Sequence, residues 1–183
     1  MRFSFSAMKR LRLRAAWVLL PAYLFFSRPS APLILTGVGL ALTGGLLRAW
    51  AAGTIRKNVI LTTGGPYAHT RNPLYLGTFL IGLGLAVASG RVAIIVGFLL
   101  FFLAVYGWTM RAESRRLERL FGDDYRHYAE SVPSFLPRLR PYRASAAPRT
   151  RFDLKSLLVS REYQAVLGTL LAFLALAAKL ALS

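Results

Sequence analysis

The chain has 183 residues, of which 55% are hydrophobic and 17% charged, and its formal net charge is +17. This apolar content is too high for a soluble domain and indicates a membrane protein. The absence of cysteine excludes disulfides, thiolate metal sites and a cysteine nucleophile. The two histidines belong to no cluster of carboxylates at metal-ligand spacing, so we expect no metal site.

Five apolar stretches follow one another along the chain, over residues 13–27, 33–53, 74–89, 92–110 and 163–182. The second, fourth and fifth are each about 20 residues long, enough to cross a hydrocarbon core of ~30 Å at ~1.5 Å per residue. The basic run before the first stretch resembles a signal peptide, but no small-x-small cleavage site follows it. We predict an all-α integral-membrane helical bundle with about five transmembrane helices, arranged as two hairpins plus a C-terminal span.

The distribution of basic residues predicts the orientation of the chain in the membrane. With a cytoplasmic N-terminus, 21 of the 24 lysines and arginines fall in inside segments, and only Arg28, Arg91 and Lys179 lie outside. We therefore interpret the charge as a topology signal with attraction to anionic lipid headgroups. Aromatic and basic residues do not interleave as they do in proteins that bind single-stranded nucleic acid, so no nucleic-acid partner is expected.

Small residues recur at four-residue spacing in the second and third stretches. They are Gly37, Ala41, Gly45, Ala49 and Gly53 in the second, and Thr78, Gly82, Ala86 and Gly90 in the third. Such stripes allow helix backbones to approach closely in lipid, where packing drives the association of helices. We expect a structural role for them.

A compact polar turn, GGPYAHTRNPLYLG at residues 64–77, lies at the start of the third stretch. Asn72 suits the N-cap of a helix and Pro73 its first position, so the turn could be a simple helix start. A helix N-terminus also offers unpaired N–H groups and a positive dipole end to an anion. Arg71 beside it would add a group that binds carboxylate or phosphate. The pattern leaves both interpretations open.

Two charged residues stand close to the expected membrane boundary. Glu113 is one of only seven acidic residues and lies where the fourth stretch ends. It could simply pair with Arg116, or it could receive a cationic ligand such as an ammonium or a sulfonium. Arg48 lies about two turns inside the second stretch, where a charge is costly unless it snorkels or pairs. Snorkelling is the simpler explanation, and a counter-ion for a substrate carboxylate or phosphate is the alternative.

The segment 111–137 continues the fourth stretch as an amphipathic cytoplasmic helix. Gly122 is expected to break this helix, and Asp123 is placed to cap a second short one. Residues 138–162 are basic and contain two prolines, so we predict a linker along the headgroups before the last span.

Two separated motifs resemble the isoprenylcysteine carboxyl methyltransferase family, which is related to the membrane phospholipid N-methyltransferases. They read LRAWAAGTIRKNVILTTGGPYAHTRNPLYLG and, after the second hairpin, ESRRLERLFGDDYRHYAESVPSFLP. The resemblance covers roughly residues 37–142. It implies a methyltransferase-like domain over residues 1–142, followed by a basic linker and an additional span over residues 143–183.

The resemblance further implies an integral-membrane enzyme that uses S-adenosylmethionine without a Rossmann domain. Carried over to this chain, the cofactor site comprises Gly65, Pro66, Tyr67, Arg71, Asn72, Pro73, Tyr75, Gly77 and Glu113, with Tyr125 and Tyr128 closing it. Two positions depart from the family: Asn72 stands where histidine is usual, and Ser114 replaces the second residue of a Glu-Glu pair. Asparagine can donate a hydrogen bond but cannot exchange a proton at neutral pH.

Methyl transfer from a sulfonium is an in-line displacement, and the nucleophile must lie about 3–3.5 Å from the methyl carbon. A carboxylate nucleophile needs no general base, and Arg48 could hold it at the lipid boundary. We assign the catalytic roles to Arg48 and Glu113. An amine must be neutral to attack, and His69 is the nearby imidazole that could assist. The shortage of bases favours a carboxylate or thiol-like acceptor with an apolar tail.

The predicted function is S-adenosylmethionine-dependent methylation of a lipophilic acceptor, an isoprenylcysteine-like carboxylate or a lipid headgroup, at the cytoplasmic membrane face. The predicted partners are a lipid-tailed small molecule and membrane lipids. One alternative is an enzyme like the sterol reductases, which would bind NADPH. Another is a non-catalytic membrane protein that retains the fold. A small transporter is disfavoured, because the sequence shows no inverted repeat and no buried charge pair.

Overall fold

The computed structural model describes residues 21–56, 60–143, 152–160 and 162–182. Within these ranges the regular structure is entirely helical, which confirms the all-α prediction. The elements are α2 (Ala31–Thr54), the 3-10 helix η1 (Gly65–Ala68), α3 (Pro73–Ala88), α4 (Val92–Phe121), α5 (Asp123–Ser131), α6 (Leu154–Val159) and α7 (Tyr163–Leu182). Residues 21–26 are also helical.

Among the described residues, three helices are long and apolar enough to cross a membrane, namely α2, α4 and α7. Helix α3 is apolar but has only 16 residues. Residues 13–20 of the first predicted span, 13–27, lie outside the described residues, as does the basic run at its start. The prediction of about five spans is therefore confirmed for three of them, and the predicted orientation stays a prediction.

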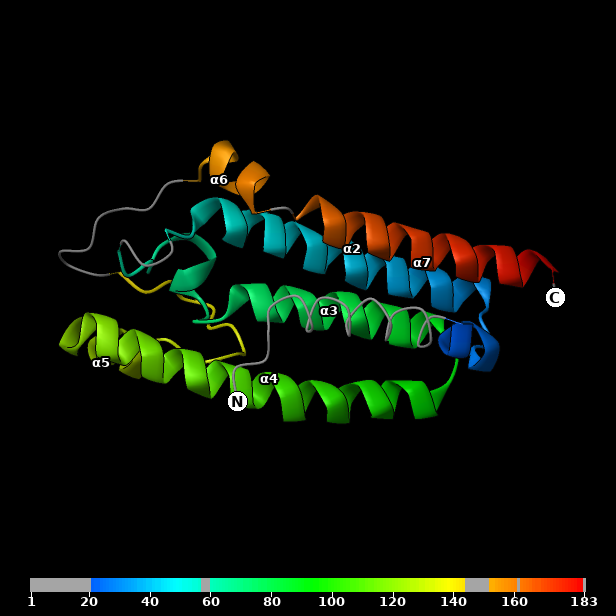
Figure 1. Cartoon of the computed structure of the whole chain (residues 1–183), viewed down its shortest axis with the longest axis horizontal. Coiled ribbons are helices and arrows are strands. Elements are labelled where there is room, and N and C mark those ends of the chain that lie inside the picture. Colours follow the sequence, from blue (N-terminus) through cyan, green and yellow to red (C-terminus); the bar gives the residue numbers. More distant parts are fainter. Residues whose placement is uncertain (1–20, 57–59, 144–151, 161, 183) are drawn as a thin grey trace, which may run out of the picture.

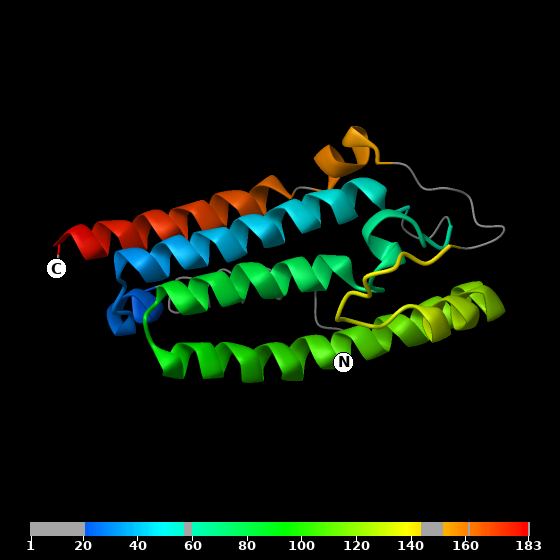
Figure 2. The ribbon, with the colours of Figure 1, turned by 180° about the vertical axis from the view of Figure 1, so that it is seen from behind.

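The long helices run roughly alongside one another in a fixed order (Figure 1). Helices α7 and α2 lie side by side, α3 lies next to α2, and α4 lies on the other side of α3, as the view from behind also shows (Figure 2). The C-terminal end of α2, η1, the start of α3, α5 and α6 all gather at one end of this bundle. The candidate site lies at that end.

Helices α2 and α3 make the closest contact in the bundle. A Cβ atom on Gly44 would lie 2.5 Å from the carbonyl oxygen of Gly77, so the two backbones touch there. Gly37 and Ala41 lie on the same buried face of α2. The predicted stripe is wrong at Gly45, which meets nothing within 4 Å among the described residues. A helix has 3.6 residues per turn, so residues on one face are alternately four and three residues apart. The buried face of α2 therefore continues from Ala41 to Gly44 and not to Gly45.

Helices α3 and α4 meet through aromatic rings. The ring centroids of Phe79 and Phe102 are 4.9 Å apart, and Phe102 stacks on Tyr106 at 4.4 Å. Phe135, from the segment after α5, lies edge-on to Phe79 at 5.6 Å. This cluster therefore attaches the segment after α5 to the membrane helices.

The chain turns sharply between α4 and α5 at Gly122, whose φ is +56°. The prediction that Asp123 caps α5 is wrong, because Gly122 occupies the N-cap and Asp123 is already the first helical residue. The Asp123 carboxylate instead accepts a hydrogen bond of 3.0 Å from Arg126. The positive φ, which glycine tolerates, lets the second helix begin without a separate capping residue.

The segment after α5 returns along the turn that precedes α3. The backbone N–H of Arg71 donates to the carbonyl of Pro133 at 3.0 Å, and that of Arg138 donates to the carbonyl of His69 at 2.9 Å. The N–H of Tyr142 donates to the carbonyl of Ala68 at 2.9 Å. These hydrogen bonds hold the two segments together. They pair backbone N–H and carbonyl groups that have no partner within a helix.

The C-terminal part of the chain packs on α2. Phe173 and Leu176 of α7 join Ala41 and Ala88 in one buried cluster. The segment before α6 is also attached, because the N–H of Asp153 donates to the carbonyl of Gly53 at 2.8 Å. Part of the predicted linker, residues 144–151, lies outside the described residues.

We predict that Gly44→Ala lowers the melting temperature of the protein in detergent, because the new methyl group would force α2 and α3 apart. The expected cost is about 1–3 kcal/mol of unfolding free energy. Gly45→Ala is the matched control and is expected to leave the melting temperature unchanged or slightly raised. An equal loss of stability in both variants would contradict the packing described.

Candidate functional site

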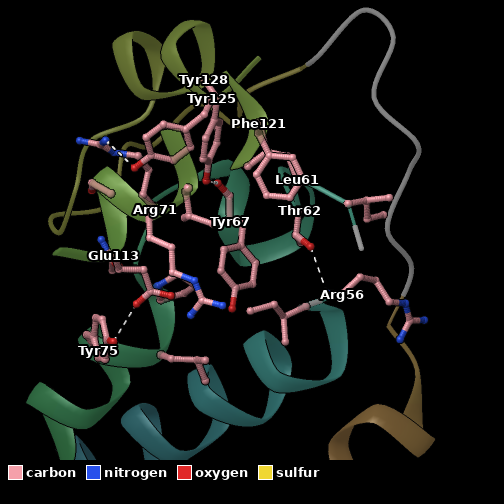
Figure 3. A pocket seen from close by; sticks show the side chains of 18 of the residues that line it. Arg56, Leu61, Thr62, Tyr67, Arg71, Tyr75, Glu113, Phe121, Tyr125 and Tyr128 are labelled. Atoms are coloured by element: carbon pink, nitrogen blue, oxygen red, sulfur yellow. Dashed lines mark hydrogen bonds between the residues drawn. The ribbon is translucent and has the colours of Figure 1, made fainter. Parts of the chain in front are cut away.

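A cavity of about 440 Å³ opens where α2 ends and α3 begins. Its volume lies in the range of roughly 300–1,000 Å³ that is typical of small-molecule sites. Side chains from the turn before α3, from α4 and from α5 gather around it (Figure 3). The predicted site residues that line it are Arg48, Tyr67, Arg71, Asn72, Pro73, Tyr75, Glu113, Tyr125 and Tyr128.

Three predicted site residues, Gly65, Pro66 and Gly77, are absent from the lining of this cavity, taken over the described part of the chain. Gly65 has a φ of +58° and begins η1 against Thr54. The carbonyl of Pro66 accepts the N–H of His69 at 3.1 Å. Gly77 leaves space beside the side chain of Arg48, where a Cβ atom would lie 2.5 Å from Cγ. The three residues shape the turn and the helix contact.

Glu113 projects from α4 toward the start of α3. Its Oε2 accepts a hydrogen bond of 2.8 Å from the hydroxyl of Tyr75, which Figure 3 marks. One donor occupies only part of the acceptor capacity of a carboxylate, which offers about four lone-pair positions. Glu113 is thereby oriented and keeps the ability to bind a cation.

Arg71 extends from the turn to α5. Its Nη1 donates to the hydroxyl of Tyr125 at 3.2 Å, and its guanidinium carbon lies 5.9 Å from the centroid of that ring. Its Nε is buried and has no hydrogen-bond partner among the residues that the structure describes. An unpaired buried donor on a charged group is costly, so this nitrogen is suited to a ligand that supplies the acceptor.

Tyr67 presents a second unsatisfied donor. The residue is 7% exposed, and its hydroxyl has no hydrogen-bond partner within the described ranges. Burial raises the pKa of this hydroxyl above its ordinary value, and the negative charges of Glu113 and Glu162 raise it further. It therefore stays protonated at neutral pH and can donate to a ligand. The hydroxyl of Tyr128 donates to the backbone carbonyl of Tyr67 at 2.6 Å and holds the residue in place.

Asn72 occupies the N-cap of α3, but its side chain makes no capping hydrogen bond in the part of the chain described here. Its Nδ2 donates instead to the carbonyl of Ser134 at 2.9 Å. The physical reason is the backbone, since Asn72 has a φ of −128° and a ψ of 56° and not the extended conformation typical of side-chain caps. Asn72 thus connects the turn to the segment after α5.

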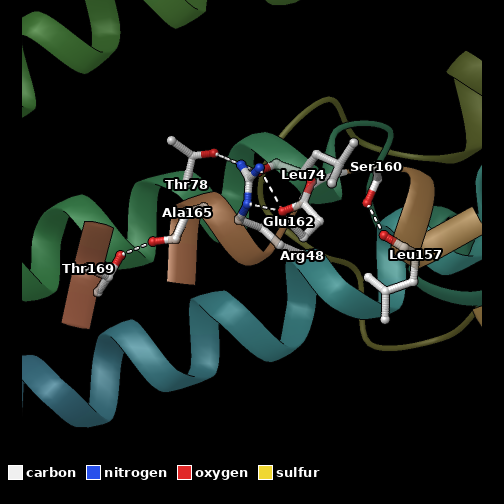
Figure 4. A network of polar contacts seen from close by, with 8 residues as sticks. All are labelled: Arg48, Leu74, Thr78, Leu157, Ser160, Glu162, Ala165 and Thr169. Atoms are coloured by element: carbon white, nitrogen blue, oxygen red, sulfur yellow. Dashed lines mark hydrogen bonds and ion pairs between the residues drawn. The ribbon is translucent and has the colours of Figure 1, made fainter. Parts of the chain in front are cut away.

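Arg48 lines the cavity where it meets helices α2 and α3, and it forms an ion pair with Glu162 (Figure 4). Its Nε and Nη2 each lie 2.8 Å from the same Oε2 of Glu162. Its Nη1 donates to the hydroxyl of Thr78 and, at 3.4 Å, to the carbonyl of Leu74. Arg48 is therefore paired and does not snorkel. The expectation that the chain has no buried charge pair is therefore wrong for this partly buried pair, which no local pattern predicts because Glu162 is 114 residues away along the chain.

His69 does not line the cavity, taken over the described residues. Its Nδ1 donates to the carbonyl of Arg138 at 2.8 Å, so the ring helps to hold the segment after α5. His69, which the sequence analysis named as the imidazole that could assist an amine nucleophile, thus makes a structural contact instead. Among the described residues there is also no group of three or more His, Cys, Asp or Glu side chains that could hold a metal ion.

The structure adds residues that the sequence did not single out. Tyr106, Thr62, Arg56 and Glu162 also line the cavity. Tyr106 precedes Glu113 by seven residues and so shares its face of α4, a spacing that could have identified it. The sequence carries no comparable signal for the other three, because they reach the cavity through tertiary contacts.

Comparison of the sequence with known protein families identifies the family of this chain. A model of the phospholipid methyltransferase family matches residues 33–124, which is half of the chain. The chain belongs to that family. The match begins at residue 33 inside α2, includes the turn, α3 and Glu113, and ends before α6 and α7.

Curated relatives fall into two groups. The chain is 38% identical over 122 residues to the cobalt-zinc-cadmium resistance protein CzcN of Cupriavidus metallidurans, covering 63% of this chain and 55% of that protein. It is 37% identical over 114 residues to the nickel-cobalt-cadmium resistance protein NccN of Alcaligenes xylosoxydans xylosoxydans, covering 60% and 51%.

The other relative confirms the resemblance drawn from the two motifs. The chain is 33% identical over 81 residues to the protein-S-isoprenylcysteine O-methyltransferase of Schizosaccharomyces pombe, covering 44% of this chain and 34% of that enzyme. The chain thus spans about half the length of the first two relatives and a third of the last. No solved structure matches it.

We predict that substitution of two tyrosines that contact each other has different effects on stability. Tyr128→Phe removes the bond to the buried carbonyl of Tyr67 and should lower the unfolding free energy by about 1–3 kcal/mol. Tyr67→Phe removes only an unsatisfied hydroxyl and should leave the stability unchanged or higher. Thermal melting of the two variants in one detergent checks this. A loss of stability in Tyr67→Phe as large as in Tyr128→Phe would show that the Tyr67 hydroxyl is already satisfied.

Proposed function

We propose that this membrane protein transfers a methyl group from S-adenosylmethionine to a lipophilic acceptor. The proposal depends most on one observation: two buried donors, Tyr67 Oη and Arg71 Nε, have no partner among the described residues and belong to the lining of one cavity. Enzymes of the phospholipid methyltransferase family use S-adenosylmethionine. The methionine end of this cofactor carries both an anionic and a cationic group, which matches the polar groups available.

The donor set fits each part of the cofactor. Arg71 and the start of α3 would hold the carboxylate, because a guanidinium and a helix N-terminus both favour an anion. Glu113 would hold the ammonium or the sulfonium. Tyr125 and Tyr128 line the same cavity and offer aromatic faces to the adenine ring.

When bound, the cofactor supplies an electrophilic methyl group. The contribution of the chain is to hold the reactants and to exclude water from them. Leu61, Leu117 and Phe121 give the cavity its apolar lining. Arg48 and Thr78, on helices α2 and α3, lie toward the membrane part of the bundle. This end would receive the acceptor, whose apolar tail would remain among the lipids.

The relatives support the proposal unequally. The isoprenylcysteine methyltransferase is an enzyme of the proposed type, whereas CzcN and NccN are named for metal resistance. An NADPH-binding enzyme and a non-catalytic protein that retains the fold are the two alternatives, and ligand titration distinguishes them.

We predict that S-adenosylmethionine binds the purified full chain in detergent and that Glu113→Gln weakens this binding by about tenfold or more, because a charge-assisted contact is lost. Isothermal titration calorimetry measures both affinities. Glu118→Gln is the matched control: it also lies on α4 but pairs with the exposed Arg126, 2.9 Å away, and should bind as the natural chain does.

The same titration with NADPH separates the alternatives. Binding of NADPH without S-adenosylmethionine would assign the cavity to a reductase. If neither molecule binds to the folded protein, the proposal fails and the non-catalytic interpretation replaces it.

A further inference from the structure

The contacts of Arg48 leave little of its guanidinium free. Its Nε and Nη2 both donate to one carboxylate oxygen of Glu162 (Figure 4). Its Nη1 donates to the hydroxyl of Thr78 and to the carbonyl of Leu74. A guanidinium has five N–H donors in a fixed fork, and the carboxylate occupies the edge that would otherwise bind an anionic ligand. An anionic group entering the cavity would therefore meet an arginine that is already neutralised.

Glu162 is supplied by a part of the chain that lies outside the family match. Its carbonyl accepts the backbone N–H of Ala165 at 3.0 Å and that of Val166 at 3.2 Å, so the residue is fixed at the start of α7. Helix α7 is itself held on α2 by the buried residues Phe173 and Leu176. The carboxylate therefore belongs to a packed element.

A second contact fixes the segment just before Glu162. Arg56, near the end of α2, forms an ion pair of 3.2 Å with Asp153 and also donates to the hydroxyl of Ser156. The ring of Phe152 packs directly on Gly53, because a Cβ atom there would lie 2.5 Å from Cδ2. Both ends of the segment that carries Glu162 are thus attached to helix α2.

Partial burial makes the pair difficult to exchange. The side chains of Arg48 and Glu162 are only 22% and 16% exposed. Removing Arg48 from Glu162 would leave a partly buried carboxylate without its counter-ion, and such a charge is costly. An anionic ligand must overcome that cost, whereas a neutral ligand leaves the pair intact.

We infer that Glu162 determines the specificity of the cavity by neutralising Arg48, so that the cavity selects lipid-tailed molecules without a free carboxylate at that end. That these molecules are the methyl acceptors rests on the proposed function, but the selection itself does not. The inference reverses the sequence-based hypothesis that Arg48 holds the carboxylate of the acceptor.

The test compares two amphiphiles that differ only in charge, N-palmitoylglycine and N-palmitoylglycinamide. Their affinities are measured by calorimetry on the full chain in a non-ionic detergent at pH 8, without S-adenosylmethionine. Every protein compared carries Arg71→Gln, because the unpaired Nε of Arg71 in the same cavity could itself bind the carboxylate. In this background, the chain with Glu162 should bind the amide more tightly than the carboxylate. In Glu162→Gln the affinity for the carboxylate should rise about tenfold or more, because Arg48 gains a free edge. The affinity for the amide should change less than twofold.

Two further variants isolate the cause. Glu118→Gln removes an exposed carboxylate on α4 and should leave both affinities unchanged. The double variant Arg48→Gln/Glu162→Gln should lose the gain, because the guanidinium that binds the carboxylate is absent. Thermal melting in the same detergent verifies that each variant is folded.

Three results would overturn the inference. The first is a protein with Arg48 and Glu162 intact, in the Arg71→Gln background, that binds the carboxylate as tightly as the amide. The second is an unchanged affinity ratio in folded Glu162→Gln. The third is a failure of both amphiphiles to bind any variant. None of these results affects the binding of S-adenosylmethionine, so a failure here is distinct from a failure of the proposed function.

Discussion

The backbone contact between α2 and α3 is the constraint from which the geometry of the site follows. Gly44 and Gly77 bring the two helices together, and lipid supplies no hydrophobic force that could replace this packing. The contact places the end of α2 beside the start of α3. It also directs Arg48, one turn beyond Gly44, past Gly77 and toward Thr78. The turn between the helices is thereby held over the same end of the bundle.

The cavity is completed by segments that are distant in the sequence and that carry different charge patterns. The segment after α5 binds the turn through backbone bonds and through Asn72, and α5 itself contributes Tyr125 and Tyr128 to the cavity. The C-terminal segment contributes a carboxylate that neutralises Arg48. One end of the cavity thus holds a satisfied ion pair. The other holds two unsatisfied donors and an accessible carboxylate, an arrangement suited to a zwitterionic ligand.

Local features of the sequence predicted the helices and the turn, because hydrophobic length and the turn motif are local signals, and the family resemblance supplied the predicted cofactor site. Nine of the predicted site residues line the cavity, Glu113 among them. The sequence failed where the outcome depends on geometry between elements. The choice of Gly44 over Gly45 depends on the rotation of α2, and the partner of Asn72 depends on the return of the chain after α5. The partner of Arg48 depends on the docking of α7, which no local pattern encodes.

The central claim is that the turn before α3 and helix α5, which the following segment holds in place, enclose S-adenosylmethionine between them. Amide hydrogen exchange of the full chain in detergent, with and without S-adenosylhomocysteine, tests this most directly. The account predicts slower exchange on ligand addition in residues 65–75 and 125–142, and unchanged exchange in the apolar half of α4 at residues 92–105. Ligand binding that protects neither of the first two segments would contradict the account.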